Sequence, residues 1–481
     1  MIKVILDCGS FFNPRARYIW DTFFTYYQVE HEYIELDREE NNPIPSSVGI
    51  TIYCGPEHRA GELIISSPTL VLCHEKSSSA MFKNKEMPSA PAFIENAPVL
   101  FAPVGGETVL HQHNRIICKA DILATAFFFL SAYQEHVCPE DVLDQYGRYP
   151  FKASYQAKYS LLEIPVVNLL FELTATWLKE LGHTVKRVDF PGSSTFTVVL
   201  SHDIDRMLFY SSGRVYKKVR NCLAELIKYR NLKESVNHLL GIFYNPHDTF
   251  DRIRNLHRQI GAGDSYFFVF NKQRHPMDPD YFIEDPEMYR ILQSLKNSGA
   301  ELGLHGSFDS LEKGTYLKEY EYAQSIIGKP CLGGRIHYLR FQIQAMFEIF
   351  ESVGLGYDSS LLFPEAPGFR TGFGLPHLLF DHEHDKAFPT LEIPLNVMDT
   401  TLFDKRYLKL SLREADKKIM SLLEIAKSSG LCISILTHND FYLHSNIMAV
   451  RLYRQTLLKA QEQGALLTDC RTIYRWWQSL Q

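Results

Sequence analysis

The 481-residue chain lacks the features that mark a membrane or exported protein. No run approaches the roughly 18 apolar residues of a membrane-spanning helix. The most apolar stretch, residues 122–130, is short and predicts a buried helix. The first residues do not lead from a basic segment into a long apolar one, so we expect no signal peptide and a cytoplasmic location.

The charge and the cysteine pattern also exclude some classes of protein. The formal net charge is −6 and the basic residues form no cluster, which argues against nucleic acid or an anionic membrane as a partner. The 9 cysteines include no Cys-x-x-Cys pair, and several lie in apolar, strand-like runs. This pattern is typical of reduced thiols in a cytoplasm rather than of a disulfide framework. The sequence does not indicate an oligomeric state.

The most informative stretch that is present is residues 196–206. The apolar run 196–200 predicts a buried strand, and Ser-His-Asp-Ile-Asp-Arg follows it directly. Ionisable groups at the end of a core strand are costly unless they are paired or bind a metal. The alternative is that Asp203 only caps the next helix and Asp205 lies on the surface. A buried strand that ends in carboxylates is the arrangement of an α/β active site.

Strand and helix patterns divide the chain near residue 190. Residues 1–190 alternate short apolar runs with helical patterns and predict a small α/β domain of unknown role. In residues 191–481, strand and helix units repeat, which predicts a parallel sheet, and seven or eight such units predict a complete or slightly open barrel. The strands expected in this second domain are 196–201, 265–270, 301–305, 335–339, 356–359, 391–396 and 432–438, with 466–468 as a candidate eighth.

Polar side chains follow the predicted barrel strands. In a β/α barrel the catalytic residues come from the loops after the strands, so we expect these side chains to meet on one rim. Such a rim suits a metal-assisted hydrolase. Its nitrogen and oxygen donors favour Zn²⁺, with Mn²⁺, Fe²⁺ or Co²⁺ as alternatives. The candidate residues are His202, Asp203, Asp205, His305, Asp309, Arg335, His337, Arg340, Asp358 and His438.

The segments SHDID, GLHGS, RIHYLR, GFRTG and LTHND resemble, in order and spacing, the motifs of the polysaccharide deacetylase family, the chitooligosaccharide-deacetylase-type carbohydrate esterases. The resemblance covers about residues 195–470. The segment DILATAFFFLSAYQEHV and the later DQYGRYP also resemble an uncharacterised N-terminal domain that precedes this barrel in a bacterial subgroup. The implied fold is a distorted (β/α)7–8 barrel of the polysaccharide deacetylase type, preceded by a smaller α/β domain.

The resemblance also implies roles for single residues. Asp203 corresponds to the general base, and Arg335, with Arg340 as the alternative, to the arginine that keeps the base charged. His438, in the segment LTH, corresponds to the general acid that protonates the leaving group. Asp205 corresponds to a metal ligand.

The remaining metal ligands are less regular. His305 matches the first of two metal-binding histidines spaced four residues apart, but Asp309 stands at the second position. His337 stands where many members have proline and could replace the missing histidine. We expect Tyr338, Arg340 and Arg370 to contact the sugar.

The implied function is a metal-dependent hydrolase of carbon–nitrogen bonds other than peptide bonds, which removes acetyl groups from an N-acetylated sugar or glycan. Two alternatives stay open. The same fold could hydrolyse another carbon–nitrogen bond, such as that of a cyclic amide. The barrel could also be catalytically silent and serve glycan binding. Metal content separates the first reading from the silent barrel.

Overall fold

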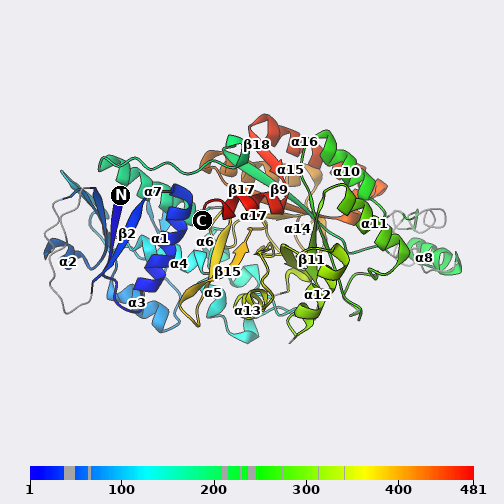
Figure 1. Ribbon diagram of the computed structural model, residues 1–481, viewed down its shortest axis with the longest axis horizontal. Coiled ribbons are helices and arrows are strands. Elements are labelled where there is room, and N and C mark those ends of the chain that lie inside the picture. The colour runs from blue at the N-terminus through cyan, green and yellow to red at the C-terminus, as the bar shows by residue number, and fades with distance from the viewer. Residues whose placement is uncertain are drawn as a thin grey trace.

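The computed structural model builds the chain around two large β-sheets; Figure 1 shows the first at one end of the long axis and the second near the middle of the molecule. The structure describes residues 1–36, 49–62, 67–207, 215–227, 247–273, 275–312, 314–340 and 342–481, and residues 230, 232, 235, 236 and 245. Among these residues, no helix is both long enough and apolar enough to cross a membrane.

The first sheet has six strands in the order β2-β1-β3-β4-β8-β7, and its neighbours are parallel except for β7 with β8. In β1, β3 and β4 every residue is buried, as expected of parallel strands that are covered on both faces. The strands are β1 (Ile2–Leu6), β2 (His31–Glu35), β3 (Ile50–Gly55), β4 (Thr69–Cys73), β7 (Val109–Gln112) and β8 (Arg115–Cys118).

Helix α4 (Ile122–Leu130) is the apolar stretch singled out in the sequence, and all 9 of its residues are buried. Asp121 caps it by accepting a hydrogen bond from Ala124 N at 2.9 Å. The helix ends where Ala132 adopts a φ of 51°, and α5 (Tyr133–His136) follows. The other elements here are α1 (Asn13–Tyr27), α2 (Glu57–Glu62), α3 (Lys76–Lys83), α6 (Tyr155–Tyr159), α7 (Val166–Glu180), β5 (Ala92–Ile94) and β6 (Ala97–Val99).

The second sheet follows the order β14-β15-β13-β12-β11-β10-β9-β17-β16, with β18 also paired to β9. All its pairs are parallel except β14 with β15. Within the described residues, no pairing joins β14 to β16, so the barrel stays open. This confirms an α/β fold with a distorted barrel after a smaller α/β unit. The strands are β9 (Phe196–Asp203), β10 (Ser265–Phe268), β11 (Glu301–Gly306), β12 (Gly333–Ile336), β13 (Tyr357–Asp358), β14 (His377–Asp381), β15 (Lys386–Glu392), β16 (Val397–Met398), β17 (Cys432–His438) and β18 (Ala465–Thr468).

Helices alternate with the strands of the second sheet, as the sequence predicts. Strand β9 pairs with β10, β17 and β18 and is buried along all 8 residues, so its polar end is held inside the protein. The sequence pattern predicts a helix over residues 215–240. The part of it that is described is α8 (Val215–Ile227), and most of the rest lies outside the described residues. The other helices are α10 (Phe250–Gln259), α11 (Pro286–Asn297), α12 (Thr315–Ile327), α13 (Ile343–Val353), α14 (Asp399–Phe403), α15 (Leu412–Ser429), α16 (Ile447–Glu462) and α17 (Cys470–Gln478).

The two parts of the chain share one continuous apolar core. Helix α1 of the first part packs against β14 and β15 of the second, and the Tyr18 hydroxyl donates to Leu378 O at 2.7 Å. Residues 135 and 370 form a buried ion pair across the same junction. The division at residues 190 and 191 stays a prediction.

Candidate active site

A cavity of about 400 Å³ opens at the carboxyl ends of the strands of the second sheet. Residues that follow β9, β11, β12 and β17 line it, as expected for an α/β barrel. The loop 276–280 and residues 400, 406 and 407 complete the wall. The ionisable residues in the wall are Arg148, Asp203, Asp205, Arg206, Asp278, Asp280, His305, His337, Tyr338, Arg406, Tyr407, His438 and Asp440.

Asp203 is the last residue of β9 and is 3% exposed. Its Oδ1 accepts a hydrogen bond from Arg335 Nη1 at 2.9 Å. The Arg335 side chain is wholly buried, donates to Ser201 Oγ and to Ser359 O and Oγ, and lies over the Phe267 ring. The Arg335 guanidinium thus forms a buried, charge-assisted hydrogen bond with the Asp203 carboxylate. The structure thus brings the predicted base and arginine together.

Asp205, His305 and His337 form a second group, beside Asp203. Their possible ligand atoms all lie within 4.8 Å of one another. His305 Nε2 lies 3.0 Å from His337 Nδ1, and Asp205 Oδ1 lies 3.5 and 3.6 Å from these two nitrogens. Asp205 Oδ1 is buried and has no hydrogen-bond partner within the described part of the chain.

The outer hydrogen bonds of the two histidines decide what this group can hold. His305 Nδ1 faces Arg335 O at 3.0 Å, and His337 Nε2 faces Met277 O at 2.9 Å. A carbonyl oxygen only accepts, so we assign the protons to these two nitrogens. The two nitrogens that face each other, His305 Nε2 and His337 Nδ1, then carry no proton, and each has a free lone pair. Two lone pairs and a carboxylate oxygen fit a divalent cation, and backbone partners of this kind orient metal-binding histidines.

Asp309, the other sequence candidate for a ligand, lies in the turn after β11. Within the described residues it belongs neither to the group of Asp205, His305 and His337 nor to the cavity wall. His337 enters the group because the chain turns sharply after β12, where Tyr338 adopts a φ of 61°. Of the two candidates that the sequence leaves open, the structure places His337 beside Asp205.

His438 ends β17 and faces the group from the other side. Its Nε2 lies 3.5 Å from Asp205 Oδ2, and its Nδ1 lies 2.7 Å from Asp399 Oδ1. Asp399 also accepts from the backbone N–H of His438 at 2.9 Å. The sequence analysis missed Asp399, which opens α14 directly after β16. A carboxylate after a short strand is a signal, but only the fold brings it to His438.

The charges in the cavity shift the pKa values of its members. Burial raises the pKa of the Asp205 carboxyl. The neighbouring His337, His305 and His438 lower this pKa by a larger amount, so the net shift is downward. Burial lowers the pKa of His438, yet Asp399, Asp205 and Asp203 raise it well above the ordinary value. His438 therefore holds a proton that it can donate, while Asp205 stays charged.

The three residues expected to contact a sugar lie in different places. Tyr338 lines the cavity. Arg340 does not line it: this residue donates to the carbonyl oxygens of Tyr146 and Phe308. Arg370 is buried and forms a two-pronged pair with Glu135, away from the cavity wall. Neither arginine is therefore placed to contact a sugar in the cavity.

Arg148 belongs to the cavity although it precedes the barrel by about fifty residues. It donates to Tyr338 O at 2.8 Å and is anchored by Asp144. The sequence of residues 144–150, DQYGRYP, predicts a turn-rich connection and no role at the cavity. Only the packing of the first part against the second shows that this turn reaches the site.

The model of a family of unknown function, DUF7033, matches residues 6–183. No curated protein shows significant similarity. A putative polysaccharide deacetylase from Mycobacterium smegmatis has 13% identity and a TM-score of 0.42, with 61% of this chain and 93% of that one covered. Puue allantoinase has 14% identity and a TM-score of 0.40, with 60% of this chain and 92% of that one covered.

The carbohydrate deacetylase Agd3 is similar over 100% of this chain and 87% of its own, at 6% identity and a TM-score of 0.36. With TM-scores below 0.5, these likenesses carry no weight for the function, and the fold rests on the strand order itself. The chain is thus similar in part to a family of unknown function and, more distantly, to solved deacetylase and allantoinase structures.

Proposed function

We propose that the chain is a metal-dependent hydrolase that removes acetyl groups from an N-acetylated sugar or glycan. One observation carries the proposal. A cavity at the strand ends joins three groups: two histidine lone pairs facing a carboxylate, a buried aspartate–arginine pair, and a histidine held by a second aspartate. These are a metal site, a base and an acid, the set that hydrolysis of an amide needs.

Asp205, His305 and His337 would hold the divalent cation, and the donor set of two nitrogens and one oxygen suits Zn²⁺. When bound, the cation supplies Lewis acidity and makes water a better nucleophile near neutral pH. A bound cation would also balance the negative charge of Asp205.

The chain's own residues would do the proton transfers. Asp203, whose Oδ1 pairs with Arg335, would accept a proton from the attacking water at Oδ2. His438 gives a proton from Nε2 to the departing sugar nitrogen, since Asp399 holds its Nδ1. General acid–base steps of this kind each contribute about 10²–10⁴-fold in rate. Tyr338 and Arg148 shape the wall against which the sugar lies.

We also infer that the protein works in the cytoplasm. All nine cysteines are free in the structure, and none of the described pairs forms a disulfide. Free, mostly buried thiols are typical of a reducing compartment. In a cytoplasm, the substrate would be a soluble glycan or a glycan precursor.

The test measures acetate release from a panel of N-acetylhexosamine substrates. We expect the zinc-loaded protein to release acetate, a chelator to stop it, and Asp203→Asn to lower kcat by about 10²–10⁴-fold while metal stays bound. Acetate release that is unchanged in Asp203→Asn would overturn the proposal. Products from cyclic amides alone would favour the other hydrolase.

The two candidate ligands give a matched pair of variants. His337→Gln should lose the metal ion of the cavity and the activity, whereas Asp309→Asn should keep both. The reverse result, with metal lost only in Asp309→Asn, would show that the ligand set is wrong.

A further inference from the structure

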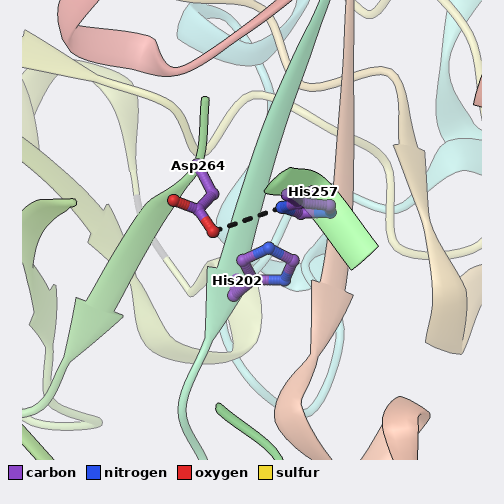
Figure 2. Close-up of side chains that lie close together, drawn as sticks. All are labelled: His202, His257 and Asp264. Atoms are coloured by element: carbon purple, nitrogen blue, oxygen red, sulfur yellow. Dashed lines mark hydrogen bonds and ion pairs between the residues drawn. The ribbon is translucent and has the colours of Figure 1, made fainter. Parts of the chain in front are cut away.

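A second group of side chains that could bind a metal lies beside strand β9, on the face of the sheet away from the cavity. We call His202, His257 and Asp264 the rear cluster (Figure 2). His202 precedes Asp203 on β9, and neighbouring residues of a strand point to opposite faces. His257 comes from α10, which covers this face, and Asp264 stands just before β10.

The rear cluster is compact and almost completely buried. Its possible ligand atoms lie within 4.8 Å of one another. The distance from His257 Nδ1 to Asp264 Oδ2 is 3.2 Å, and the two imidazole rings are stacked with centroids 5.1 Å apart. His202 is 0% and His257 1% exposed. Two ligands of a tetrahedral zinc ion stand about 3.3 Å apart, so the His257–Asp264 spacing already suits one.

Each member is held from outside by a second group. His202 Nδ1 faces Thr437 Oγ1 at 2.9 Å, and His257 Nε2 lies 3.5 Å from the Tyr453 hydroxyl. The Tyr266 hydroxyl donates to Asp264 Oδ2 at 2.6 Å. Outer contacts of this kind orient the histidines and carboxylates that bind metals.

One nitrogen of the rear cluster remains unused. His202 Nε2 is buried and has no hydrogen-bond partner within the described residues. In Figure 2 the ring of His202 directs a nitrogen toward the paired His257 and Asp264. The hydrogen bond between His257 and Asp264 accounts for the burial of these two side chains. It does not account for His202 Nε2, which is a buried polar atom without a partner and is costly unless it binds something.

We propose that the rear cluster binds a divalent transition-metal ion, with Zn²⁺ best suited to its two nitrogens and one carboxylate oxygen. The ion uses the free nitrogen of His202 and joins β9, α10 and the chain before β10. It is a structural site, since the sheet separates it from the cavity. By fixing His202, it steadies the strand that carries Asp203.

The test counts metal ions in the full-length chain reconstituted with Zn²⁺ and, for its visible spectrum, Co²⁺. Wild type should bind two equivalents. The double variant Asp205→Asn/His305→Gln, which removes the ligands in the cavity, should keep one equivalent and a metal-dependent rise in Tm. That result needs no change in the rear cluster, so it decides the matter even if rear-cluster variants fail to fold.

A reciprocal variant completes the design. Asp264→Asn should lose one equivalent and keep metal-dependent activity, and Asp251→Asn, an exposed carboxylate on the same helix as His257, should keep both equivalents. Wild type with one equivalent and the double variant with none would overturn the rear site and leave the proposed hydrolase standing. Two equivalents that both survive in Asp264→Asn would also overturn it.

Discussion

His438 is held at both ring nitrogens by carboxylates. Asp399 Oδ1 lies 2.7 Å from Nδ1, and Asp205 Oδ2 lies 3.5 Å from Nε2. The contact with Asp399 places a proton on Nδ1. The other ring nitrogen, Nε2, faces the cavity. Asp399 does not line the cavity, and in the proposed reaction it would act through His438 as a positioning residue.

Replacing Asp399 by Asn should therefore slow the reaction without emptying the metal site. The amide still fills the space, but it loses the charge that supports a protonated His438. We expect kcat to fall by about 10²-fold or more, KM to change little, and bound metal to stay constant. Steady-state kinetics with metal analysis checks this. An unchanged kcat would show that His438 needs no partner.

At the scale of elements, the turn 144–149 connects the first part of the chain to the cavity. Asp144 Oδ1 accepts from the backbone N–H groups of Tyr146 and Arg148, and Oδ2 accepts from Arg148 Nε. Arg148 in turn donates to the carbonyl of Tyr338, the cavity residue with a φ of 61°. The turn thus supports the wall of the site from outside the barrel.

Arg148→Ala should loosen that wall. A charge-assisted hydrogen bond contributes roughly 1.5–3 kcal/mol, so we expect kcat/KM to fall by about tenfold or more. The fall should appear mainly in KM, with bound metal unchanged. Lys152→Ala, an exposed cation nearby, is the matched control and should behave as wild type. Equal kinetics in the two variants would contradict the role of the turn.

Strand β12 is packed so closely that one position admits only glycine. A Cβ at Gly333 would lie 1.9 Å from Tyr357 Cζ, and the tyrosine is wholly buried with its hydroxyl bonded to Glu301. Gly333→Ala should lower the free energy of unfolding by about 1–3 kcal/mol, because the ring must move. Denaturant unfolding measures it, and a change below about 0.5 kcal/mol would show that the ring moves freely.

At the scale of the whole molecule, a buried ion pair links the two parts. Arg370 Nε and Nη2 donate to the two oxygens of Glu135 at 2.8 and 2.6 Å, and both side chains are nearly inaccessible to solvent. The pair lies where the segment after α4 meets the loop after β13. Breaking it by removing one partner leaves a buried charge without its counterion.

Arg370→Ala should therefore cost about 3–5 kcal/mol of stability. Lys186→Ala, which breaks an exposed pair with Asp189, should cost less than about 1 kcal/mol. Urea unfolding of both variants makes the comparison. Similar costs in the two variants would show that the junction relaxes around the lost charge.

Much of the fold follows from local patterns. Strand β17 lies where its sequence predicts it, and β9, β11 and β18 lie within two residues of expectation. Strands β14 and β16 were missed, since β14 is an antiparallel edge outside the repeated units and β16 spans only 2 residues. Strand β12 spans Gly333–Ile336 instead of the expected 335–339, and it ends early because the chain turns at Tyr338.

The sequence by itself determined the acidic end of β9, the histidine of β11 and the histidine of β17, because a buried run followed by polar residues is a local signal. Only the tertiary structure decided their partners. The register of β11 with β12 sets His305 opposite Arg335, and thereby presents a carbonyl to one ring nitrogen. Asp399 and Arg148 reach the site from distant segments. Such contacts depend on strand order and packing across the whole molecule, which no local pattern contains.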